Sequence, residues 1–471
     1  MIDAVPGAAR YADARHVRAR SERVTVRQGE PAALESSEEV GIGVRVLVEG
    51  AWGFAASRGE DRPEALAALE RAMAVATAQP RADFAGLAPE PPARGSYSAP
   101  AATDPFSVPV ADKLTLLSEA DAAMREEAQV TVTRAHLLSQ REEKTFASTE
   151  GAVTSQVLTE CGGGLEATAV GVAGVQVRSY PGSHSGHVAQ AGWEHVLELD
   201  LPGNARRVAH EAAGLLAAPP CPEGATTLVL GGEQLGLQLH ESVGHAVELD
   251  RVLGGEASYA GTSFVGPDAL GSLRYGSEEM SVTADATLPG ALGSYEWDDE
   301  GVPAQVLPIV RDGVLRGFLS SRESAAAIGL ERSGGCMRAE SFARQPIVRM
   351  TNVSLDPGGA GTFDELLADT GDGIYMETNR SWSIDSRRLH FQFGTEAAWE
   401  IVDGRLGQMY RDPVYAGTTP AFWAGLDAVC SEADWRLWSV TDCGKGEPGQ
   451  VMRVSHGSAP ARFRDVEVGV A

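Results

Sequence analysis

Two histidines and a glutamate stand within six residues of each other in the segment His240-Glu241-Ser242-Val243-Gly244-His245. Neutral imidazole is the commonest metal ligand in proteins. A carboxylate directly after the first ligand is placed to take a proton from a metal-bound water, as a hydrolase requires. The pattern indicates a metal site with His240 and His245 as ligands and Glu241 as general base. A polar helix face with hydrogen-bonded histidines is the common alternative at this spacing.

The five-residue spacing of the histidines does not fit one face of an ordinary α-helix. Apolar residues recur at helical spacing, at Leu235, Leu239, Val243 and Val247. On such a helix, residues five apart point about 140° away from each other. Both imidazoles can reach one metal only if the helix loosens into a π-type turn, and Gly244 suits that distortion. We therefore expect a π-turn here, a feature that concentrates at functional sites.

A catalytic zinc ion needs a third protein ligand. The sequence close to the helix offers Glu248 and Asp250 as candidates. The residues by themselves leave the choice between these two carboxylates open.

Several motifs together resemble those of the TldD/PmbA metallopeptidases, also called the modulator of DNA gyrase family. The stretch from Leu237 to Leu253, followed by Gly261-Thr262-Ser263, is similar to the signature of that family. Further similar stretches follow in the expected order, at residues 298–303, 312–319, 349–352 and 443–450, and residues 41–45 and 52–55 also fit. The resemblance extends over nearly the whole chain, so it is much more specific than one short motif.

The resemblance implies a ligand set, a mechanism and a partner. In that family the third zinc ligand is a cysteine in a C-terminal Cys-Gly-Lys segment, and the matching residue is Cys443. The expected enzyme is a zinc-dependent peptidase in which Zn²⁺ is held by His240, His245 and Cys443. Glu241 then activates the zinc-bound water. The expected substrates are small, extended or unfolded peptides, and an extended peptide would add as a strand to a sheet edge.

The same resemblance predicts a dimer, either a homodimer or a heterodimer with a related PmbA/TldE-like subunit that lacks the motif. This chain has the complete motif and so resembles the zinc-bearing, TldD-like subunit. Two other functions stay open. One is a non-catalytic or regulatory subunit of such a complex with a structural metal, and the other is a metal-dependent hydrolase of a non-peptide amide.

A run of carboxylates and one arginine outside the helix also match family segments. Asp298, Asp299 and Glu300 form a dense acidic run, which ordinarily is a solvated turn. Arg349 could anchor a substrate carboxylate or carbonyl, or pair with that acidic run. The sequence gives none of these four residues a definite role.

The remaining histidines of interest are not expected to bind the metal. His184 and His187 are spaced like ligands, but their Gly/Ser-rich surroundings favour a surface turn. We expect His390 and His456 to be strand and loop residues without partners.

The composition indicates an acidic, folded protein. Lys and Arg total 39 against 65 Asp and Glu, a net charge of −26, which disfavours nucleic acid and anionic membranes as partners. Five cysteines without paired spacing argue against disulfides and for the cytoplasm, and we expect four of them to be structural: Cys161, Cys221, Cys336 and Cys430. The chain shows neither a signal-like N-terminus nor an apolar stretch of about 18 residues, so we expect no membrane span.

The strand, helix and turn patterns around the motif predict an α+β fold in two domains. Residues 1–218 are expected to form an antiparallel sheet with helices, and residues 225–471 a strand-rich domain that carries the His-Glu-x-x-x-His helix. Residues 219–224 form the linker, because three prolines in four positions fit neither a helix nor a strand.

Turn residues and periodicity predict the individual elements. Strands are expected at 41–48, 52–55 and 226–230, and helices from Pro63 until Pro80, at about 205–217, at about 321–328 and at about 362–367. Asp112 is predicted to cap a helix that reaches Met124. Residues 86–109 contain six prolines and are expected to be an extended connection without regular structure.

Overall fold

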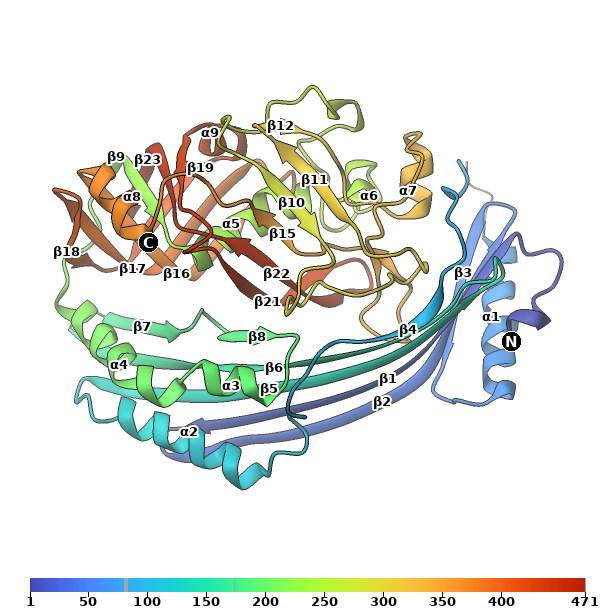
Figure 1. Cartoon of the computed structure of the whole chain (residues 1–471), viewed down its shortest axis with the longest axis horizontal. Coiled ribbons are helices and arrows are strands. Elements are labelled where there is room, and N and C mark those ends of the chain that lie inside the picture. Colours follow the sequence, from blue (N-terminus) through green and yellow to red (C-terminus); the bar gives the residue numbers. More distant parts are fainter. Residues whose placement is uncertain (80–83, 173, 471) are drawn as a thin grey trace.

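The computed structural model describes residues 1–79, 84–172 and 174–470. A long, curved sheet from the N-terminal half lies beneath a strand-rich C-terminal half, and helices pack at both ends of the long sheet (Figure 1). The predicted α+β class is confirmed. The division into domains at 219–224 stays a prediction. The part of the chain that the structure describes contains no helix long and apolar enough to cross a membrane.

Four long strands, β1, β2, β5 and β6, make up most of the lower sheet, and four shorter strands pair at its edges. Each long strand has 17 to 19 residues, which at about 3.3 Å per residue gives roughly 55–65 Å. The strand order is β3-β2-β1-β5-β6-β4, with β7 and β8 also paired to β6. The bounds are β1 Tyr11–Arg27, β2 Glu30–Val48, β3 Ala51–Ser57, β4 Arg94–Ser98, β5 Val130–Ser148, β6 Val153–Gly171, β7 Gly174–Tyr180 and β8 His187–Ala189.

Strand β4 corrects the prediction for residues 86–109. This segment was expected to lack regular structure, but Arg94–Ser98 pairs in parallel with β6. Residues 93–99 contain no proline, so their amide groups are free to bond along the open edge of β6.

Helices cover the lower sheet at two places. Helix α1 (Arg62–Ala78) packs on β2 and β3, while α2 (Val110–Met124), α3 (Trp193–Glu198) and α4 (Leu201–Ala217) lie along the face opposite the C-terminal half (Figure 1). Helix α1 begins near Pro63 as predicted, and Pro80 lies outside the described residues. The prediction of Asp112 as a cap was wrong, because α2 begins directly after Pro109 and Asp112 falls in its first turn.

The C-terminal half contains a seven-stranded sheet in the order β16-β9-β23-β19-β17-β18, with β20 on β23. A four-stranded sheet, β12-β11-β10-β15, and two hairpins, β13–β14 and β21–β22, complete it. The strand bounds are β9 Gly224–Leu230, β10 Val282–Asp285, β11 Val306–Arg311, β12 Val314–Leu315, β13 Met337–Arg338, β14 Ile347–Val348, β15 Val353–Leu355, β16 Gly373–Ile384, β17 His390–Val402, β18 Arg405–Tyr410, β19 Pro413–Thr418, β20 Leu426–Val429, β21 Arg436–Lys445, β22 Gln450–Ser458 and β23 Ala461–Val470.

The helices of this half are short. They are α5 Gly232–Leu239, α6 Leu249–Val252, α7 Arg322–Ala327, α8 Phe363–Thr370 and α9 Thr419–Ala424. Helices α7 and α8 confirm the two short helices predicted from the sequence.

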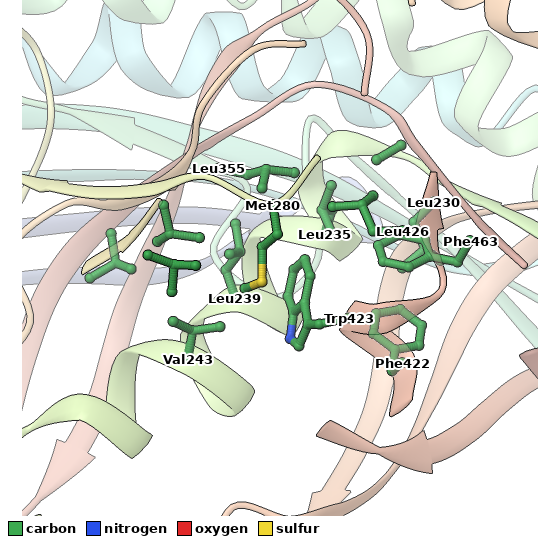
Figure 2. Packing of buried hydrophobic residues seen from close by; sticks show 14 of the residues in the cluster. Leu230, Leu235, Leu239, Val243, Met280, Leu355, Phe422, Trp423, Leu426 and Phe463 are labelled. Atoms are coloured by element: carbon green, nitrogen blue, oxygen red, sulfur yellow. The ribbon is translucent and has the colours of Figure 1, made fainter. Parts of the chain in front are cut away.

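The apolar face of α5 and the turn after it fixes the rotation of the motif. Leu235, Leu239 and Val243 are fully buried, and in Figure 2 they point into a cluster with Met280 and Trp423. Burying such side chains stabilises this orientation by about 1.5–3 kcal/mol each. His240, Glu241 and His245 are therefore directed away from this core, towards a cavity that all three line.

Candidate metal centre

The first two candidate ligands lie on a distorted helical turn. After α5 the chain forms a π-helical turn, η2 (His240–Gly244), and then a 3₁₀ turn, η3 (His245–Val247). The predicted π-turn is thus present. A Cβ atom at Gly244 would lie 2.1 Å from Sδ of buried Met350, so a larger residue would have to displace that side chain.

The turn brings both histidines to Cys443 from the β21–β22 hairpin. One ligand atom from each of His240, His245 and Cys443 lies within 4.8 Å of the others, and all three residues are buried. Sγ of Cys443 is 3.6 Å from Nε2 of His245. Tetrahedral zinc with ordinary bond lengths would hold a sulfur and a nitrogen about 3.5 Å apart, so this pair fits the ion.

The two carboxylates that the sequence left open as third ligands, Glu248 and Asp250, bond to protein side chains instead. Oε2 of Glu248 is 2.8 Å from Nδ1 of His245, and Nζ of Lys445 lies 3.3 Å from the same oxygen. Asp250 pairs with Lys445 at 2.8 Å. Within the described residues, neither carboxylate belongs to the group that could hold a metal.

Hydrogen bonds fix which nitrogen of each imidazole is free. The carbonyl of Val353 can only accept, so Nδ1 of His456 donates to it at 2.7 Å. Nε2 of His456 must then accept from Nδ1 of His240 at 2.8 Å. Glu248 likewise accepts from Nδ1 of His245. Both candidate ligands therefore keep an Nε2 lone pair available, the arrangement common for metal-bound histidines.

His456 corrects a prediction, because it was expected to lack partners. It is fully buried on β22, opposite Trp438 of β21, and beside α5. No local pattern in the sequence distinguishes it.

Burial sets the protonation states that a metal requires. Desolvation lowers the pKa of His240 and of His245, so both imidazoles are neutral. Burial acts to raise the pKa of Cys443, but the interaction of the thiol with the His245 ring and the positive charge of Arg349 outweigh burial and lower this pKa. Neutral imidazoles and a thiolate are the forms that bind zinc.

Arg349 holds the hairpin that carries Cys443. Its guanidinium donates to the carbonyl of Cys443 and, at 3.0 Å, to the carbonyl of Gln450. The side chain is fully buried and bonded to this hairpin, a role that neither of the two alternatives left open by the sequence describes.

The acidic run is also buried, which corrects the expected solvated turn. Asp299 pairs with Lys144 at 2.7 Å and Arg15 at 3.5 Å, both from the lower sheet. Glu300 pairs with Arg45 at 3.2 Å, and Asp298 accepts three backbone N–H bonds. The ion pairs of Asp299 and Glu300 tie the two halves of the molecule together.

A cavity of about 400 Å³ opens at the metal cluster and is lined by His240, Glu241, His245 and Cys443. Glu241 forms an ion pair there with Arg388, from the turn between β16 and β17. Arg388 was not among the residues expected at the site, because no pattern near it in the sequence signals a contact 147 residues away.

The two histidines of the Gly/Ser-rich segment lie next to this cavity without joining the cluster. His184 is exposed, lines the cavity and packs its ring against Trp382. His187 is not on a surface turn: Nε2 bonds to the carbonyl of Leu437 at 2.7 Å and Nδ1 to His195 at 3.0 Å. It therefore ties β8 to β21.

Family models match almost the entire chain. The PmbA/TldA metallopeptidase domain 1 matches residues 12–76, the central domain residues 103–216 and the C-terminal domain residues 223–470. The chain belongs to the TldD/PmbA family of metallopeptidases.

Individual relatives agree with this assignment. A metalloprotease of Methanothermobacter thermautotrophicus is 31% identical over 98% of this chain and 95% of its own. One of Methanocaldococcus jannaschii is also 31% identical, over 96% and 95%. The solved structure of TldE from Thermococcus kodakarensis has the same fold, with a TM-score of 0.78 at 15% identity, covering 99% of this chain and 98% of that one.

Proposed function

We propose that the chain is a zinc-dependent peptidase that hydrolyses small or unfolded peptides. The observation that carries this proposal is the convergence of His240, His245 and Cys443 beside a cavity that Glu241 also lines. Two imidazoles and one thiolate suit zinc, and three protein ligands leave a fourth position open, as catalytic sites require. The metalloprotease names of the relatives support a metal at this place.

The residues around the cavity can carry the steps of peptide hydrolysis. A bound zinc ion would supply the Lewis acidity that activates water and polarises the peptide carbonyl. Glu241 takes a proton from the attacking water as the water oxygen bonds to the carbonyl carbon. The same carboxyl returns that proton to the amine nitrogen as the C–N bond breaks. His456 and Glu248 keep the two imidazole rings in place throughout.

An extended peptide is the substrate that we propose for this cavity. Residues 439–443 of β21 line it, and in the described chain β21 forms a strand pairing with β22 alone. His187 bonds to the carbonyl of Leu437 and Arg349 to that of Cys443, and between Leu437 and Cys443 no second strand of the described residues is paired with β21. A peptide that adds there as a strand is held by its backbone and can have varied side chains. A folded protein could not present its backbone to a strand edge inside such a cavity.

We propose that the chain acts in the cytoplasm as a dimer, with itself or with a TldE-like subunit. Its five cysteines are free thiols, which suits a reducing compartment. Residues 30–41 of β2 have a neighbouring strand on one side, β1, in the described sheet, and such an open edge favours pairing with another chain. The mass in solution, alone and with a TldE-like chain, tests this pairing.

Metal content and peptide cleavage test the enzymatic proposal. The purified chain should contain about one zinc per subunit and cleave an unstructured peptide. Glu241→Gln should keep the zinc and lose about 10²–10⁴-fold in kcat, since it removes the general base. Glu278→Gln, a change at an exposed carboxylate of the same half, serves as control.

Two results would contradict the proposal. Zinc retained by a wild-type protein that cleaves no peptide would favour the structural-metal subunit. Cleavage at the wild-type rate by Glu241→Gln would remove the assigned base.

A further inference from the structure

Arg388 stands out among the residues of the cavity because of its charge. Of the described residues that line the cavity, it is the sole lysine or arginine, and the carboxylates there are Glu233, Glu241 and Asp442. Its side chain is 16% exposed and reaches Glu241 through Nη1. A second donor, Nε, is buried and has no acceptor in the described chain. The guanidinium therefore has unused hydrogen-bonding capacity beside the candidate general base.

The turn that carries Arg388 holds it in an unfavourable backbone conformation. Its φ of 61° lies in the left-handed region, which costs a residue with a side chain about 1 kcal/mol. Oδ1 of Asp385 accepts from the amides of Arg387 and Leu389, and Thr419 Oγ1 donates to the carbonyl of Arg388 at 2.7 Å. The fold thus maintains a strained arginine, and such strain concentrates at functional positions.

The proposed reaction needs a cation at this place. Two neutral imidazoles and one thiolate around a divalent zinc ion leave a total charge of about +1, less than three neutral ligands would leave. Attack of water on a peptide bond concentrates negative charge on the carbonyl oxygen. A guanidinium that is mostly buried, as that of Arg388 is, stabilises such charge more strongly than one in bulk water.

We propose that Arg388 alternates between two acceptors: it pairs with Glu241 in the free protein and donates to the carbonyl oxygen of the scissile bond when a peptide binds. This inference rests on the proposed peptidase function and adds a residue that binds substrate. Peptide binding then frees the Glu241 carboxylate for water, so the base is exposed only when a substrate occupies the cavity.

Kinetics of zinc-loaded variants provide the first test. Arg388→Gln should lower kcat by about 10²–10³-fold, as loss of an oxyanion donor does, with unchanged zinc content. Arg388→Lys should recover part of this loss, because it restores the charge without the planar fork. Arg387→Gln, a change at the exposed neighbour in the same turn, should behave like the wild type. A wild-type kcat in Arg388→Gln would overturn the inference.

Peptide binding to the metal-free protein provides a second test, independent of catalysis. Calorimetry with a short alanine–glycine peptide compares the wild type, Glu241→Gln, Arg388→Gln and the double variant. Glu241→Gln should tighten binding about fivefold or more, because a neutral amide oxygen competes for the Arg388 guanidinium less strongly than the Glu241 carboxylate does. The same substitution should have no effect when residue 388 is glutamine. Equal effects in both backgrounds would refute the exchange of acceptors.

The two tests separate this inference from the function on which it rests. A zinc-loaded wild type that cleaves no peptide overturns the proposed function and the role of Arg388 together. Cleavage by the wild type with an unaffected Arg388→Gln overturns the role of Arg388 alone.

Discussion

Replacing His456 tests the hydrogen-bond chain that orients His240. His456→Phe removes the acceptor of the Nδ1–H of His240 and the donor to the carbonyl of Val353, which are 2.8 Å and 2.7 Å from the His456 ring. Leaving a buried polar group without a partner costs about 1–3 kcal/mol. The two orphaned groups should therefore destabilise the metal-free protein by about 2–6 kcal/mol. Losing the partner of a metal-binding histidine should also weaken metal affinity by about 10–100-fold.

Two measurements and two control variants make this prediction specific. Urea unfolding of metal-free protein gives the stability, and competition with a chelator gives the zinc affinity. His456→Gln should retain most of the affinity, because its amide offers both an acceptor and a donor. His390→Phe changes an exposed histidine and should alter neither quantity. A folded His456→Phe protein with wild-type zinc affinity would refute the reasoning.

Two further predictions concern buried ionisable residues. Lys445→Met leaves the fully buried Glu248 without its cation, and should cost about 3–5 kcal/mol in urea unfolding of the zinc-free protein; a loss below about 1 kcal/mol would contradict this. Burial lowers the pKa of His136, in the lower sheet, to about 4, against about 6.5 when unfolded. The unfolded chain therefore binds the extra proton between these pH values, so stability is lost as pH falls through this window. By linkage, His136 should account for about 2 kcal/mol of the loss between pH 7 and pH 5. His136→Leu should lose correspondingly less in urea unfolding at these two pH values, and an equal loss would refute the assignment.

The sequence predicted the features that local patterns determine, but it did not predict contacts between residues far apart in the chain. The spacing of the histidines and Gly244 predicted the π-turn, because only that turn lets both rings reach one ion. Cys443 came from the family resemblance, since no periodicity joins it to the helix. His456 and Arg388 reach the site from 216 and 147 residues away, so no short pattern reveals them. The buried Asp299 was mistaken for solvated because its cationic partners lie in the other half of the chain.

The orientation of Cys443 depends on a β-bulge in β21 that no sequence pattern predicts. Val440 pairs with Val454 and Cys443 with Met452, so two residues of β21 stand opposite one residue of β22. A one-residue shift moves every later side chain of a strand to its other face. With regular pairing, Cys443 and Lys445, two positions apart, would both turn away from the metal cluster. The same register shift therefore sets which face of β21 carries Cys443, the candidate thiolate ligand, and Lys445, which pairs with Glu248 beside His245. The β21–β22 hairpin is thus as important for the site as the helix that carries the motif.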